Sequence, residues 1–262
     1  MLKLLKYEWK ACARTCLPLY GVLILMSLIS RILYVIPKNA SLDFMLPAIS
    51  SMLYMGVMMA AFVVTAVILI QRFYKNLLGS EGYLMFTLPV TVTQHLLSKT
   101  IIAVVMIALS GIAAFLSIGI FADMSFGTLF VDMIKGVARS GGLLFGLELL
   151  VLAVLGIAGM ALFLYMCIAL GHLASRHRLL MSIVWYVVLS TALQVLMLMV
   201  MMGVGNAVPE PFVDLMKVWW SGITPMGAVH LMLRFCCVAA LIGDAVCFLV
   251  TRWILTHKLN LE

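Results

Sequence analysis

Long runs of apolar residues alternate along the chain with short segments that carry most of its charges. Six of these runs reach the roughly 20 residues that a helix needs to cross the hydrocarbon core of a bilayer. The pattern therefore predicts an all-α integral membrane protein, with residues 1–262 forming a single transmembrane domain. The predicted spans cover about 17–36, 48–70, 100–122, 145–171, 179–204 and 228–255.

The composition supports this fold class. The chain is 65% hydrophobic and 10% charged, with a mean hydropathy of +1.21. A soluble domain is nearer half apolar and about a quarter charged, so it could not cover its surface with so few charges. Six spans fill the length of the chain and leave no room for a soluble catalytic domain.

The basic residues predict an orientation. Most of the 17 lysines and arginines fall in the N-terminal segment, in the two loops that follow spans two and four, and after span six. All of these segments lie on one side of the membrane, and basic loops stay in the cytoplasm. Both termini are therefore expected in the cytoplasm. This topology accounts for the net charge of +7 without a nucleic-acid partner, and the expected partner of these cations is the lipid bilayer.

Residues 1–16 are expected to form an amphipathic helix. Leu5, Trp9, Cys12 and Cys16 recur at spacings of three and four, so they share one face. The lysines and the arginine of this segment form the neighbouring stripe, as in helices that lie in the headgroup plane. Two interpretations stay open: a simple surface anchor, or a lever that runs along the membrane into span one.

A short helix is predicted within the cytoplasmic segment 71–99. Gly79 and Ser80 interrupt the helix that leaves span two. Ser80 is a suitable cap for a helix from Glu81 to about Leu88, with Glu81 favourably placed at its N-terminus. Pro89 ends this helix, because the residue before a proline avoids the α conformation.

The helix into span three is expected to begin at a capping box formed by Thr91 and Gln94. The short helix before it would present Tyr83, Leu84 and Phe86, suspended between two spans. This link could transmit force from a docked cytoplasmic partner to both spans. It could equally fold back onto the bilayer interface, which its aromatic residues would suit.

The stretch RFYKNLLGSEGYLMFTLPVTVTQHLLSK resembles the first cytoplasmic loop of bacterial type 2 ABC exporter permeases. In that family an acidic residue, an apolar patch, a Leu-Pro-Val-Thr/Ser turn and a basic residue opening span three recur in this order. The amphipathic N-terminus and the six spans also match the family. The corresponding positions here are Glu81, Tyr83 to Leu88, Leu88 to Thr91, and Lys99.

The resemblance implies a coupling helix seated on a separate ABC ATPase subunit, with the N-terminal helix as the connecting helix beside it. The chain itself contains no GxxxxGK[ST] phosphate loop, so ATP and Mg are expected on that partner and no cofactor is expected here. A second permease copy, identical or a sister chain, is also implied. The implied coupling residues are Glu81, Tyr83, Leu84, Phe86, Leu88 and Pro89, and those of the connecting helix are Leu5 and Trp9.

Four ionisable residues fall inside the predicted spans: Arg31, Glu148, Arg234 and Asp244. An unpaired charge near the bilayer centre costs about 2.5–3.5 kcal/mol, so these side chains should face protein or water. The first three lie toward the outer side, and Glu148 is expected to pair with one of the two arginines. Asp244 lies deeper, where it could line a path, bond across a subunit interface or only fix helix packing.

The outer loop 205–227 is expected to carry short helices. Trp219 and Trp220 suit a membrane interface. The resemblance implies that Phe212, Trp219 and Trp220 belong to an outer gate. The six cysteines include no CxxC pair, so no metal or redox site is expected.

The leading hypothesis is the permease subunit of an ABC exporter in a bacterial plasma membrane. It would move an amphipathic substrate outward, such as a peptide, drug, lipid or glycolipid. A non-transporting receptor or immunity protein that binds a peptide at the outer face is the alternative. An integral membrane enzyme is a further one, although neither HExxH nor GxSxG occurs.

Overall fold

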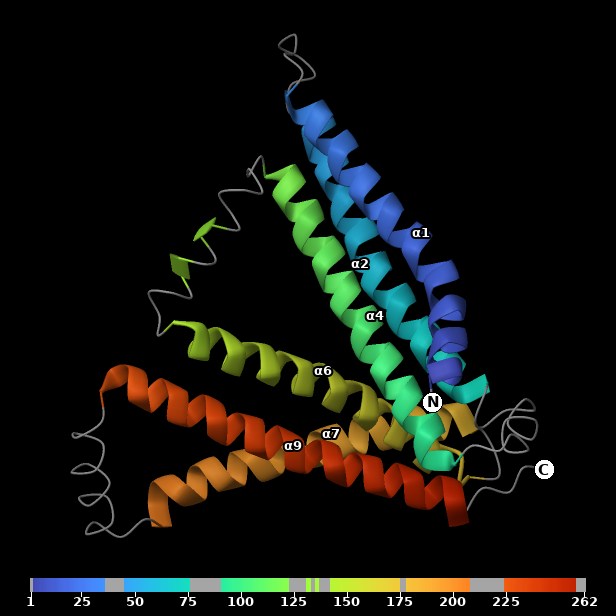
Figure 1. Cartoon of the computed structure of the whole chain (residues 1–262), viewed down its shortest axis with the longest axis vertical. Coiled ribbons are helices and arrows are strands. Elements are labelled where there is room, and N and C mark those ends of the chain that lie inside the picture. Colours follow the sequence, from blue (N-terminus) through green and yellow to red (C-terminus); the bar gives the residue numbers. More distant parts are fainter. Residues whose placement is uncertain are drawn as a thin grey trace. The chain divides into compact units, whose positions relative to one another are not determined.

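In the computed structural model of the chain, the described residues are dominated by six long helices (Figure 1). Each of them is long and apolar enough to cross a membrane, so the predicted all-α, six-span fold is confirmed and the chain is a multi-pass membrane protein. They are α1 (Leu2–Val35), α2 (Met45–Phe73), α4 (Val92–Phe121), α6 (Leu143–Gly171), α7 (Arg178–Ala207) and α9 (Pro225–His257). The structure describes residues 2–35, 45–75, 91–122, 131–132, 135–136, 142–174, 178–207 and 224–257.

Each of these helices begins before its predicted span, and α4 shows how one of them begins. The side chain of Gln94 accepts a hydrogen bond from the backbone N–H of Thr91 at 3.3 Å. This is the reciprocal half of a capping box, and Thr91 has the extended backbone of a residue that precedes a helix. The predicted cap is confirmed, and it starts α4 well ahead of the apolar run.

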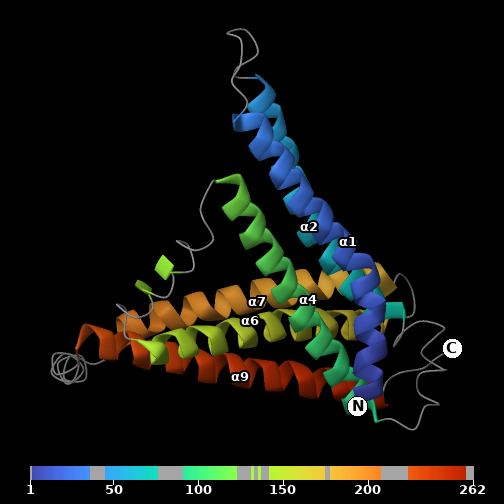
Figure 2. The same cartoon turned by 45° about the horizontal axis from the view of Figure 1, so that its top comes forward.

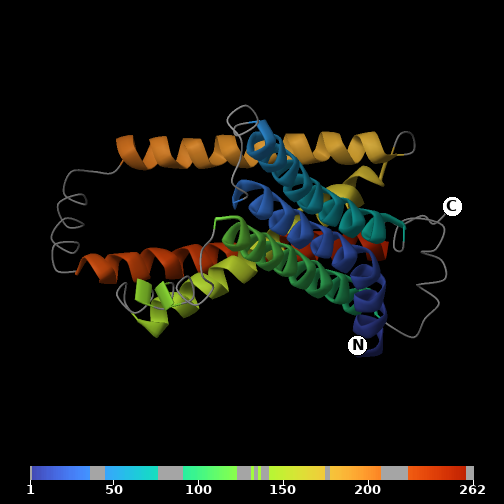
Figure 3. The ribbon, with the colours of Figure 1, turned by 90° about the horizontal axis from the view of Figure 1, so that it is seen from above.

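Helix α1 is continuous from Leu2 to Val35, so the predicted amphipathic segment 1–16 is helical but passes without a break into the first span. Pro18 lies inside the helix. A proline in a helix removes one backbone hydrogen bond and favours a bend. Figure 3 shows the N-terminal turns of α1 running in a different direction from the rest of the helix.

The chain divides into two compact units, Met1–Gly136 and Val137–Glu262. In the first unit, α1 packs against both α2 and α4 (Figure 1). In the second, α6 packs against both α7 and α9 (Figure 2). Each unit is therefore a three-helix bundle in its described residues, and in the first unit α2 and α4 also contact each other.

Polar side chains join the three helices of the first unit. The hydroxyl of Tyr20 on α1 lies 3.1 Å from Thr65 Oγ1 on α2 and donates to the backbone carbonyl of Met106 on α4 at 3.2 Å. The hydroxyl of Tyr54 lies 2.9 Å from Ser117 Oγ. Within a bilayer the hydrophobic effect does not draw helices together, so such bonds contribute to helix association along with close packing.

Small residues let the helices of the second unit approach closely. A Cβ atom built on Gly171 at the end of α6 would collide with the backbone of Ser182 on α7. One built on Gly159 would collide with the carboxylate of Asp244 on α9. Glycine at these two positions is what allows this spacing of the helices.

Candidate functional site

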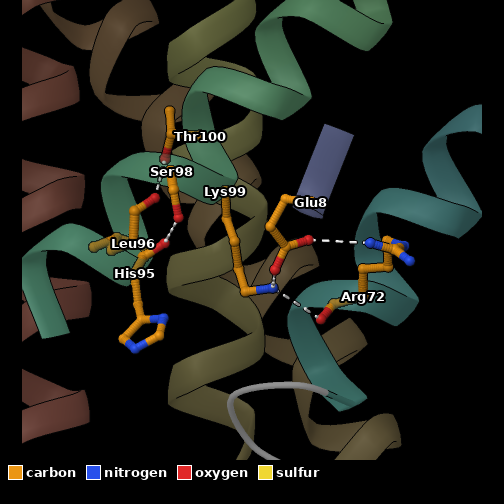
Figure 4. A network of polar contacts seen from close by, with 7 residues as sticks. All are labelled: Glu8, Arg72, His95, Leu96, Ser98, Lys99 and Thr100. Atoms are coloured by element: carbon orange, nitrogen blue, oxygen red, sulfur yellow. Dashed lines mark hydrogen bonds and ion pairs between the residues drawn. The ribbon is translucent and has the colours of Figure 1, made fainter. Parts of the chain in front are cut away.

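Three ionisable side chains meet at one end of the first unit, and each comes from a different helix. Lys99 Nζ on α4 donates to Glu8 Oε1 on α1 at 2.8 Å, and Arg72 Nη1 on α2 donates to Glu8 Oε2 at 3.0 Å. Lys99 Nζ also lies 3.4 Å from the carbonyl oxygen of Arg72. Figure 4 shows the Glu8 carboxylate lying between the two cations. We refer to these three residues as the Glu8 cluster.

Two of the three charged members of the Glu8 cluster are buried, and Arg72 is half-buried. Glu8 is 7% exposed and Lys99 is 5% exposed. Glu8, Cys12 and Cys16 follow one another at intervals of four, and both cysteines are buried as well. This face of the N-terminal segment therefore packs on protein. A buried charge is tolerated only when it is paired and hydrogen-bonded, and the cluster supplies both conditions.

Two members of the Glu8 cluster, Arg72 and Lys99, lie near the two ends of the predicted cytoplasmic segment 71–99. Arg72 stands in the last turn of α2, and Lys99 stands two turns into α4. The chain between these helices contains the predicted coupling residues. All six of them lie outside the described residues: Glu81, Tyr83, Leu84, Phe86, Leu88 and Pro89.

Glu8 was missed by sequence reasoning, which treated Lys99 only as the basic residue that opens span three. The predicted connecting-helix residues, Leu5 and Trp9, are both half-buried on the same segment of α1. One signal could have found Glu8: it is the first acidic residue of the chain, with none following before Asp43, and it lies four residues before a buried cysteine.

A second ionisable cluster joins α6 to α9 in the other unit. Glu148 Oε1 accepts from Arg234 Nε at 2.8 Å, and Glu148 Oε2 lies 2.5 Å from His230 Nδ1. The predicted pairing of Glu148 with one of two arginines is confirmed for Arg234, while His230 was not anticipated. The ring of Phe145 meets the His230 ring edge-on, with centroids 6.1 Å apart. We refer to Glu148, His230 and Arg234 as the Glu148 cluster.

The remaining intramembrane charges occupy separate places. Arg31, in the first unit, lines a cavity of about 480 Å³ together with Tyr34 and Phe121. Asp244 is half-buried on α9 and faces Gly159 of α6. Among the residues that the structure describes, no side chain pairs with the Asp244 carboxylate.

The predicted outer gate, formed by Phe212, Trp219 and Trp220, lies outside the described residues. Within the described part of the chain, no group of three or more His, Cys, Asp or Glu side chains could hold a metal ion. All six cysteines are free thiols.

No protein-family model, no curated protein and no solved structure matches this chain.

Proposed function

We propose that this chain is the membrane-spanning subunit of an ABC exporter, driven by a separate ATPase subunit. The observation that carries the proposal is the Glu8 cluster. It ties the N-terminal segment of α1 to the last turn of α2 and the second turn of α4. These turns lie on either side of residues 76–90, within the segment 71–99 that is predicted in the cytoplasm.

This arrangement suits a mechanical link. A helix transmits displacement along its axis because each of its turns is held by backbone hydrogen bonds. Buried ion pairs resist separation, since pulling one partner away leaves an uncompensated charge. Force applied to segment 76–90 would therefore move α1, α2 and α4 as one body.

Apolar residues in segment 76–90 support an ATPase subunit as the partner. The apolar residues Leu84 and Phe86 would dock in a groove of the ATPase, which would hold ATP and Mg. A second permease copy would complete the path, and an amphipathic substrate would leave a bacterial cell through the plasma membrane. The apolar interior is compatible with a peptide, drug, lipid or glycolipid and does not select among them.

The experiment is a comparison of two matched double variants. Leu84→Ala with Phe86→Ala changes the proposed docking surface, whereas Leu143→Ala with Phe115→Ala removes the same atoms from exposed positions on α6 and α4. The first variant should lose substrate-stimulated ATP hydrolysis in the complex purified from native membranes, while eluting from a sizing column like the wild type. The control variant should keep it.

Two competing functions make the opposite prediction. A peptide receptor or immunity protein, and an integral membrane enzyme, have no need to pass force through segment 76–90. Unchanged phenotype and unchanged partner activity in the Leu84 and Phe86 variant would therefore favour one of them over the exporter.

A further inference from the structure

Arg234 is held in a way that leaves much of its guanidinium group available. Its Nε is bonded to Glu148, which fixes the orientation of the side chain, yet the side chain is 66% exposed. Within the described part of the chain, no other hydrogen bond or ion pair engages its two terminal nitrogens. An oriented guanidinium edge of this kind matches the oxygen atoms of a phosphate group.

The depth of Arg234 in the membrane follows from helix geometry. Helix α9 has 33 residues, which is about 50 Å at 1.5 Å per residue, against about 30 Å of hydrocarbon. If α9 is centred, roughly 10 Å project at each end, and Arg234 lies about 14 Å from Pro225. The arginine is therefore about one turn inside the hydrocarbon boundary, where its side chain can reach the phosphate level.

The same calculation places Glu148, which is bonded to Arg234, at a similar depth in the membrane. Helix α6 has 29 residues, so its centred ends project by about 7 Å, which is also the distance from Leu143 to Glu148. Glu148 thus stands close to the boundary of the same leaflet. The Glu148 cluster lies where lipid headgroups meet acyl chains.

The surface below Arg234 is apolar and open. Val238 and Leu241 follow it at intervals of four and seven, so they continue the same face of α9 toward the membrane centre. Val238 is 58% exposed and Leu241 is 57% exposed. A cation above an apolar stripe complements a molecule with an anionic head and a hydrocarbon tail.

We propose that the Glu148 cluster and this stripe form a binding site for a phospholipid. Arg234 would donate hydrogen bonds from the N–H groups of both terminal nitrogens to the lipid phosphate, with Glu148 holding the guanidinium in position, and one acyl chain would lie over Val238 and Leu241. An exposed arginine inside a transmembrane helix needs an anion or water, and the phosphate of the surrounding lipid meets that need. The site does not depend on the exporter proposal.

The test is site-specific photocrosslinking of the full-length chain in its native membrane. A benzoylphenylalanine replaces Val238, the membrane is irradiated, and adducts are identified by mass spectrometry. The wild-type background should yield adducts enriched in phosphate-bearing lipids relative to the whole membrane. Arg234→Gln should lower these adducts at least threefold, and Arg234→Lys should lower them less because the charge is kept.

A matched probe at Leu249, which is 57% exposed near the other end of α9, provides the control. Its lipid adducts should not respond to the Arg234 substitutions. A crosslink from position 238 to a protein chain would overturn the proposal in favour of a subunit interface. The proposal would also be overturned if the adducts formed with Arg234 intact had the same lipid composition as the whole membrane. That result does not depend on the folding of any Arg234 variant.

The source of the phosphate is tested on the purified protein. A short-chain phospholipid should raise the thermal stability of the wild type, whereas inorganic phosphate at the same concentration should not, since it lacks the acyl chain. Equal stabilisation by inorganic phosphate would contradict the proposed phospholipid site and indicate a site for a free anion.

Discussion

The carboxylate of Glu8 is shared between Lys99 and Arg72, so the three charges of the cluster depend on a single acidic side chain. Burying these charges costs desolvation free energy, and leaving one of them without its partner costs more. If Glu8 loses its charge, Lys99 remains in place with a side chain that is only 4% exposed. The cluster is therefore the place where a change of one residue should have its largest effect on stability.

Glu8→Gln should lower the free energy of unfolding by about 3 kcal/mol, because it leaves a buried cation without its counter-charge. The measurement is unfolding by SDS titration in mixed micelles. Asp132→Asn, at an exposed acidic position, is the matched control and should have no effect. Combining Glu8→Gln with Lys99→Met should restore part of the lost stability. If the double variant is as unstable as the sum of both singles, the ion-pair account is wrong.

Tyr20 should also stabilise the contact between the three helices, by a smaller free energy than the Glu8 cluster. Tyr20→Phe removes the hydroxyl that bridges Thr65 and the Met106 carbonyl. We expect a loss of about 1 kcal/mol, since hydrogen bonds between membrane helices are individually modest. Tyr7→Phe removes a hydroxyl from a residue that is 71% exposed and should leave the unfolding curve unchanged. Equal effects of the two substitutions would contradict the bridging role.

At the scale of elements, the spacing of α6 from its neighbours depends on particular glycines. Gly171 faces the backbone of Ser182, which cannot move without displacing α7. Gly159 faces the end of the Asp244 side chain, which can rotate away. Gly156, on the same helix, has open space around it.

These surroundings predict a graded series of glycine-to-alanine variants. Gly171→Ala should destabilise by about 2 kcal/mol or more through overpacking, and Gly159→Ala by less. Gly156→Ala should be neutral or slightly stabilising, because alanine favours the helix. SDS unfolding of the three purified variants checks the order, and a destabilising Gly156→Ala would show that helix spacing is not the cause.

Elements were predictable from sequence where the signal is local. The apolar runs predicted the six long helices that the structure describes, and the cap formed by Thr91 and Gln94 spans only four residues. The Glu8 to Lys99 pair joins residues 91 positions apart, so no local pattern could reveal it. Glu148 and Arg234 could be paired because charges inside a membrane need partners, whereas His230 can be neutral and carries no such requirement.

At the scale of the whole molecule, the distribution of basic residues predicts that both termini lie in the cytoplasm. Fusions of a fluorescent protein and of alkaline phosphatase to the end of the chain test this directly. The fluorescent fusion should be bright and the phosphatase fusion inactive. The same pair of reporters inserted after Ala207 should give the reverse result, since that position is predicted on the outer side. An active phosphatase at the C-terminus would invert the topology and place segment 76–90 outside the cell.

The exporter proposal requires a partner that supplies ATP hydrolysis, since this chain has no phosphate loop of its own. The most direct measurement is purification of the tagged chain from its native membrane in a mild detergent, followed by identification of stoichiometric partners. We predict a co-purifying protein with a GxxxxGK[ST] motif. A chain that repeatedly emerges alone, or only with further copies of itself, in several detergents would contradict the proposal and favour a receptor or immunity protein.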